Sequence, residues 1–134
     1  MSALAACGVW PGTRGLAAAA LDVDGGIRTV RLPRNDDARA GLVAYLVAAG
    51  AAELALPDML VRADAIARIA LANGLTVWSV PRMVVEPLRQ AAGLSPQRAA
   101  ALAAIVARLP RIAHYRAQLH RVQHVDPGKQ LRLI

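Results

Sequence analysis

The 134-residue sequence predicts a single α/β domain with a mixed five-stranded sheet and the element order β-β-β-α-β-α-β-α. Two observations predict this class. Short apolar runs separated by turn residues open the chain, which is typical of an antiparallel meander. After residue 35, helix-like and strand-like segments alternate, which indicates parallel strands joined by crossover helices. The chain is also long enough to bury a core of its own.

The three opening strands are predicted from apolar runs that end at turn residues. Pro11 and Gly12 end the first run, and Asp24 with Gly25 separates the second run from the third. Glycine accepts positive φ at little cost, so an Asp-Gly pair between two such runs predicts a hairpin. The expected strands are residues 4–10, 16–23 and 27–32.

Helices and strands are expected to alternate over the next part of the chain. Asn35, Asp36 and Asp37 suit a helix start, because they can cap it and their charge suits the positive end of the helix dipole. Val, Trp and Thr gather in "LTVWSV", which favours a strand. The expected elements are a helix at 35–50, a strand at 52–58, a helix at about 59–73 and a strand at 75–80.

The last third is expected to be helical, with interruptions at Pro87, Pro96 and Pro110. Ser95 before Pro96 has the pattern of an N-cap followed by proline at the first helical position, which starts a helix that runs to residue 109. The tail reads as another amphipathic helix and an open end. We therefore divide the chain into a domain at 1–110 and a basic C-terminal helix and tail at 111–134.

The composition favours an anionic partner and argues against a membrane protein. The formal net charge is +7, which suits nucleic acid, although an Arg-rich solvated surface explains the same charge. No apolar run reaches the roughly 20 residues that span a membrane, and no secretory signal is recognisable. Cys7 is the single cysteine, so it cannot form an internal disulfide; its expected role is a small core residue. We expect a cytoplasmic protein.

The stretch "GVWPGTRGLAAAALD" at 8–22 resembles the first-strand signature of the ribonuclease H-like superfamily, in its RuvC-type resolvase and transposase branch. That signature is glycine, aliphatic, aspartate, proline, glycine, small hydroxyl and basic residue. Trp10 stands where the aspartate is expected. The matching positions are Gly8, Val9, Pro11, Gly12, Thr13 and Arg14. The element order resembles the family over roughly residues 4 to 109, so the resemblance implies a ribonuclease H-like sheet.

The resemblance also implies a chemistry whose residues are missing. Family members hold two divalent ions, usually magnesium, between three or four carboxylates from the first strand, the end of the fourth strand and the last core helix. Here no acid precedes Asp22, and none lies between Glu86 and Asp126. Only Asp58 is near a family metal position, and one carboxylate cannot hold two such ions. We therefore expect no catalytic residues, no metal and no cofactor, with Trp10 and Asp58 marking a degenerate site.

The individual candidates have structural alternatives. Asp58 suits a helix cap as well as a relic ligand. Trp10 either fills the emptied metal pocket or lies exposed as a stacking platform for a base. His120 and His124 can share a helical face with His114 nearby, but two or three histidines on a solvated basic helix explain the pattern without zinc.

Basic residues accumulate in the last third of the chain with one aromatic residue among them, a combination that can contact phosphates and stack a base. The expected nucleic-acid contacts are Arg14, Arg108, Arg111, Tyr115, Arg116 and Arg121.

Three functions follow from these observations. The leading hypothesis is a catalytically degenerate ribonuclease H-like domain that binds DNA or RNA. The alternative is a protein-interaction or assembly module, for instance a homodimer, because Ile112, Leu119 and Val122 give the tail an apolar side. The third is a residual metal-dependent nuclease that combines Asp58 with Asp22 or with a partner's carboxylate.

Overall fold

The structure is a computed structural model that describes residues 3–12, 15–33, 35–108 and 120–122. Within these residues the strands form one mixed sheet of order β3-β2-β1-β4-β5-β6. The strands are β1 (Leu4–Gly12), β2 (Gly15–Asp22), β3 (Ile27–Leu32), β4 (Glu53–Pro57), β5 (Thr76–Val80) and β6 (His120–Arg121). The helices are α1 (Asp36–Ala48), α2 (Leu60–Ala63), α3 (Ile66–Ala72), α4 (Arg82–Ala92) and α5 (Pro96–Arg108).

The predicted α/β class is confirmed, and so is the mixed sheet of the five predicted strands. β1, β2 and β3 form an antiparallel meander, while β4 pairs parallel with both β1 and β5. The turn between β2 and β3 closes through the Asp22 amide, which donates to the Gly26 carbonyl at 2.8 Å. None of the helices in the described part of the chain has the length and apolar character that crossing a bilayer requires.

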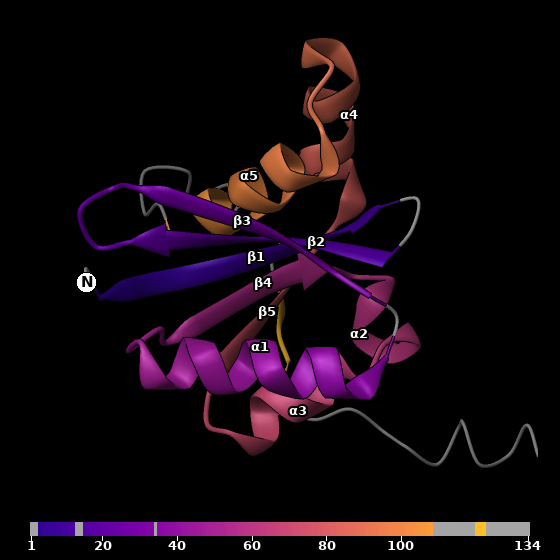
Figure 1. Cartoon of the computed structure of the whole chain (residues 1–134). Coiled ribbons are helices and arrows are strands. Elements are labelled where there is room, and N and C mark those ends of the chain that lie inside the picture. The colour runs from indigo at the N-terminus through magenta and orange to yellow at the C-terminus, as the bar shows by residue number, and fades with distance from the viewer. Residues whose placement is uncertain (1–2, 13–14, 34, 109–119, 123–134) are drawn as a thin grey trace, which may run out of the picture.

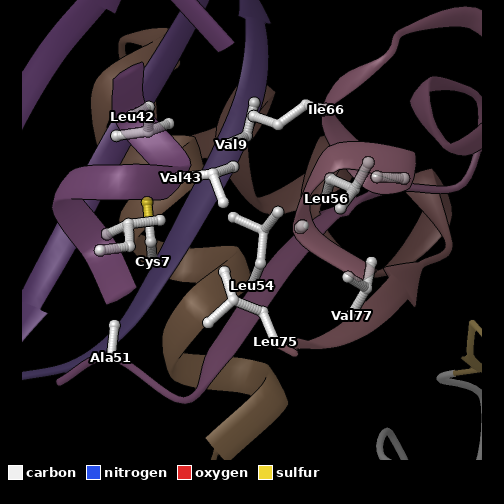
Figure 2. Close-up of a cluster of buried hydrophobic side chains, with 14 of the residues drawn as sticks. Cys7, Val9, Leu42, Val43, Ala51, Leu54, Leu56, Ile66, Leu75 and Val77 are labelled. Carbon is white, nitrogen blue, oxygen red and sulfur yellow. The ribbon is translucent and has the colours of Figure 1, made fainter. Parts of the chain in front are cut away.

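Helices cover both faces of the sheet. Figure 1 shows α1, α2 and α3 on one face and α5 on the other, with α4 beyond α5 and farther from the sheet. The larger core lies between α1, α3 and the sheet and is built mainly from Leu, Val and Ile, with smaller side chains between them. Figure 2 shows part of this core, in which helix and strand side chains interdigitate. Its labelled members include Val9, Val43, Leu54, Leu56, Ile66 and Val77.

The α5 face is packed differently, with alanines in place of larger side chains. The inner surface of α5 is formed by Ala99, Ala100, Ala103 and Ala104, none of which is exposed. The helix lies so close to β1 that a Cβ atom built on Gly8 would stand 1.8 Å from the Ala100 carbonyl oxygen. Glycine at position 8 therefore permits direct contact between the helix backbone and the strand.

A buried ion pair fixes α1 to the segment between α2 and α3. The Arg39 guanidinium approaches the Asp64 carboxylate at 3.0 Å, and the two side chains are 4% and 15% exposed. Arg39 also donates to the Pro33 carbonyl. Asp64 Oδ1 accepts from the Ile66 amide at 2.9 Å, so the same carboxylate stabilises the start of α3.

Three sequence-based expectations about helices are corrected. The single helix expected from about Met59 is two helices, because Asp64 is extended and turns its carboxylate onto the next helix. Pro87 lies inside α4 and does not end it, and α4 continues to Gly93 in the left-handed conformation. Proline removes only the hydrogen bond to the Met83 carbonyl, and Met83 lies on an exposed first turn where water can replace that bond.

The third correction concerns the tail, which was expected to be helical at positions 120 and 121. These residues form β6, antiparallel to β5, with Arg121 opposite Trp78 and His120 opposite Ser79. The Val122 amide also donates to the Val77 carbonyl at 2.9 Å. The pairing satisfies backbone groups at the outer edge of β5, which outweighs the helical pattern of the sequence. The rest of 111–134 lies outside the described residues.

Candidate functional site at the carboxyl edge of the sheet

A pocket of about 1000 Å³ opens at the edge of the sheet where β1, β4 and β5 end. Because these strands are parallel neighbours, their carboxyl ends meet at one edge. Open α/β sheets commonly bind ligands in the crevice outside such strand ends. Trp10 and Asp58, which were predicted to mark a degenerate site, both line this pocket, together with Arg82, Glu86 and Arg89 from α4.

Trp10 is a packing residue. Its side chain is 3% exposed and belongs to the smaller core cluster, which contains Val80, Val85 and the inner alanines of α5. The indole thus fills the space between the sheet and the helices at the end of β1. Because the ring is covered, it is not presented as a stacking surface for a base.

Asp58 is exposed at the opening of the pocket, directly after β4. Its amide donates to the Val80 carbonyl at 3.0 Å, which ties it to the end of β5. Its Oδ1 accepts from the Met59 amide at 2.8 Å. The expectation that Asp58 caps the following helix is wrong, since the N-cap of α2 is Met59 and α2 has no side-chain cap. The Asp58 carbonyl closes the first turn by accepting from Val61 at 3.3 Å.

Glu86 and Arg89 belong to the pocket but were not singled out from the sequence. Glu86 Oε1 accepts from Arg89 Nε at 2.7 Å and from an Arg89 terminal nitrogen at 2.5 Å. These hydrogen bonds lower the pKa of the Glu86 carboxyl, and Trp10 adds to the same effect. The negative charge of Glu86 is therefore already paired with a cation of its own helix. An acid and an arginine three residues apart are common on helix surfaces. In the sequence, only the position of this pair soon after β5 could have indicated that the two residues line the pocket.

The register of the sheet separates Asp22 from Asp58. Asp22 pairs with Leu4 at the amino end of β1, whereas Asp58 follows the carboxyl end of β4. The offset of about seven strand residues corresponds to roughly 20 Å. The suggestion that Asp22 supplies a second metal-binding carboxylate is therefore wrong. Asp22 instead faces Arg28 at 3.8 Å beside its turn. The described residues contain no group of three or more His, Cys, Asp or Glu that could hold a metal ion.

Of the basic residues expected to contact nucleic acid, the structure describes Arg108 and Arg121, and neither of them lines this pocket. α5 runs from Pro96, close to Gly12, to Ala104 above Gly8, so Arg108 lies toward the amino end of β1. Arg121 is exposed on β6 at the sheet edge. Residues that pair across neighbouring strands point to the same face of a sheet. Gly8 pairs with Ala55, Ala55 with Trp78, and Trp78 with Arg121, so Arg121 lies on the same face as Gly8, which is the face that α5 covers. The other expected contacts lie outside the described residues: Arg14, Arg111, Tyr115 and Arg116.

The histidine pattern in the tail is also changed by the structure. His120 belongs to strand β6, so the helical face that would join it to His124 is not formed at that position. His114 and His124 lie outside the described residues.

We expect the Cys7 thiol to be unreactive in the folded protein. It is fully buried on β1, and burial raises its pKa to about 12, so at pH 8 almost none of it is thiolate. Iodoacetamide at pH 8 should leave the native chain unmodified and should alkylate it once in denaturant, as read by intact mass. Rapid alkylation of the native chain would contradict the buried position of Cys7.

Comparison with known proteins gave no family: no protein-family model matches the chain. No significant match was found among curated proteins either.

Proposed function

We propose that this chain is a ribonuclease H-like domain that binds nucleic acid without cleaving it. The observation that carries the proposal is the content of the pocket at the carboxyl edge of the sheet. An indole and the alanines of α5 occupy the region where a two-metal nuclease needs several carboxylates. Asp58 is the one acid there without an arginine bonded to it among the described residues, and one carboxylate cannot hold two divalent ions.

The sheet supports the ribonuclease H-like part of the proposal. An antiparallel meander followed by parallel strands is the arrangement that the resemblance implies over residues 4–109. The Gly-aliphatic signature lies on β1, and Trp10, at the aspartate position of that signature, lines the pocket.

Electrostatics support the binding part. The chain carries a formal net charge of +7, which attracts a polyanion. Arg108 belongs to α5, and Arg121 lies on the same side of the sheet as that helix. A backbone that crosses this side would meet both positions, with phosphate contacts that carry no sequence information.

A matched pair of variants tests the binding surface. Arg121→Gln removes one charge from the α5 side, and Arg68→Gln removes one charge from exposed α3 on the opposite side. We expect Arg121→Gln to weaken binding to single- or double-stranded oligonucleotides and to lower the slope of log Kd against log salt by about 1. Arg68→Gln should leave both quantities unchanged. Fluorescence anisotropy over a salt series measures both.

Two results would contradict the proposal. One is that the protein binds neither DNA nor RNA at low salt. The other is cleavage of the oligonucleotide with magnesium or manganese that is lost in Asp58→Asn, because the protein would then be a nuclease. Equal losses in the two arginine variants would place the binding surface elsewhere while leaving the binding function in place.

An assembly module is the second candidate function, favoured by the outer strand β3. Ile27 is 51% exposed on this strand, and Val23 next to it is 61% exposed. In the described sheet β3 has a neighbour on one side only, and such an edge can pair with a second copy.

The mass in solution tests this candidate. A dimer should show twice the chain mass of 14.1 kDa by light scattering. Ile27→Lys should return it to a monomer, because a charge on an edge strand opposes pairing. Val47→Lys, at an equally exposed position on α1, is the control and should remain dimeric. A wild-type chain that is monomeric at every concentration would exclude the assembly function.

A further inference from the structure

A second pocket, of about 370 Å³, lies on the face of the sheet opposite to α5, between β3 and α1. Its floor is made of small, buried side chains: Cys7 on β1 with Ala18 and Ala20 on β2, which are 0%, 1% and 7% exposed. Cys7 and Ala20 are direct cross-strand partners, so the floor is continuous over two strands. Where α1 spans the sheet, these small residues leave space that Leu or Ile would fill. Cys7 and Leu42 appear at this end of the core in Figure 2.

The walls of the pocket are apolar and its mouth is open to solvent. Leu32 and Leu42 are buried in the walls, while Val30 and Tyr45 at the mouth are 47% and 43% exposed. A hollow with this lining offers water few hydrogen-bonding partners. Apolar cavities of this kind stay dry or take up small apolar molecules. Its volume lies at the lower end of the range of small-molecule sites, roughly 300 to 1000 Å³.

The polar groups of the pocket are gathered at its mouth. Arg28 donates to the Tyr45 hydroxyl at 3.3 Å, and its Nε lies 3.8 Å from Asp22 Oδ1. The Arg28 side chain remains 46% exposed, and the 3.8 Å approach is longer than a hydrogen bond. The guanidinium therefore keeps donors that a planar anion can accept in bidentate fashion. An apolar hollow beneath an arginine that is half-exposed and only loosely paired with Asp22 is complementary to a molecule with an apolar body and one anionic end.

We propose that this pocket binds a small amphipathic monocarboxylate, of the size of a medium-chain fatty acid. Its apolar part packs against the exposed Val30 and Tyr45 side chains above the buried floor, and its carboxylate accepts from Arg28 beside the Tyr45 hydroxyl. The polar lining groups at the mouth orient the ligand and the apolar side chains hold it. The site lies on the opposite face from Arg121 and is independent of nucleic-acid binding.

Three probe molecules test the chemistry of the site. Octanoate carries both features, octan-1-ol carries the chain without the charge, and acetate carries the charge without the chain. We expect octanoate to raise the thermal midpoint by roughly 4 °C at about ten times its Kd. Octan-1-ol should bind about tenfold more weakly, because it lacks the charge-assisted hydrogen bonds to Arg28. Acetate should give no shift.

Variants then locate the ligand. Arg28→Gln should reduce the affinity for octanoate about tenfold, to that for octan-1-ol. Val30→Phe places a ring into the mouth from an exposed position and should abolish binding of both. Val47→Phe adds the same ring at an equally exposed position on α1 that does not line the pocket, so it should bind as the wild type does. Circular dichroism of each variant shows that the fold is kept.

The proposal fails if octanoate gives no saturable shift at millimolar concentration. It also fails if Arg28→Gln binds octanoate as tightly as the wild type, since the carboxylate then has no partner in the site. Equal loss in Val30→Phe and Val47→Phe would show non-specific adsorption of the chain and would likewise overturn it.

Discussion

Replacing Gly8 by valine should lower the free energy of unfolding by at least about 3 kcal/mol or leave the chain unfolded. The Cβ of any larger residue at this position would stand 1.8 Å from the Ala100 carbonyl oxygen. The obstacle is helix backbone, so it cannot turn aside as a flexible side chain could. Valine favours strands on propensity alone, and a loss of stability would therefore report the contact with α5. Urea unfolding followed by circular dichroism measures the change.

Gly41→Ala is the matched control with the opposite sign. Gly41 lies inside α1 on its exposed side, and a Cβ there would meet nothing within 4 Å. Alanine should raise the free energy of unfolding by up to about 1 kcal/mol, because glycine in a helix interior costs backbone entropy. A Gly8→Val variant as stable as the wild type would show that α5 does not rest on β1.

Breaking the ion pair between Arg39 and Asp64 should have the second large effect. Arg39→Met is expected to lower the free energy of unfolding by about 3 to 5 kcal/mol, because it leaves the Asp64 carboxylate and the Pro33 carbonyl without their partner in a mostly buried position. Thermal or urea unfolding measures the loss. Arg39→Met with Asp64→Leu should recover part of it, since no uncompensated buried charge then remains.

The partly exposed pair of Arg28 and Asp22 provides the comparison. Its closest approach is 3.8 Å, and the Arg28 side chain is 46% exposed. Arg28→Met should change the free energy of unfolding by less than about 1 kcal/mol, as is usual for exposed pairs. If the two arginine variants cost the same, burial is not what makes the Arg39 pair important.

The parts of the fold that depend on local signals could be predicted from the sequence. The turn after β2 follows from Asp24 and Gly25, and the alternation of elements after residue 35 gives the parallel strands. The start of α5 follows from Ser95, whose hydroxyl accepts from the Arg98 amide at 3.3 Å. In each case the interacting groups are only a few residues apart, so a short stretch of sequence contains all the residues that determine the structure.

The parts that depend on distant partners could not be predicted. The break between α2 and α3 depends on Asp64, whose partner Arg39 is 25 residues away. β6 forms because β5 offers an open edge, which the helical pattern around His120 does not reveal. Contacts between residues so far apart in the sequence form only once the chain has folded, so no local pattern predicts them.

The candidate site was predicted in part. Trp10 and Asp58 were paired through the resemblance, and the structure brings both to one pocket. Glu86 and Arg89 were missed because the sequence shows that they can pair within α4 but does not show that α4 lies at the pocket. The pocket of about 370 Å³ near Arg28 was missed because small residues at three positions give no pattern along the chain.

The close contact between α5 and β1 also limits which side chains the inner face of the helix can carry. Ala100 and Ala104 have no exposed surface, and their backbones meet the strand at Gly8. An acidic residue at either place would require the helix to retreat, which would uncover Trp10 and open the smaller core. Carboxylates could therefore be introduced on this face of α5 only together with a displacement of the helix, which would disrupt the packing around Trp10.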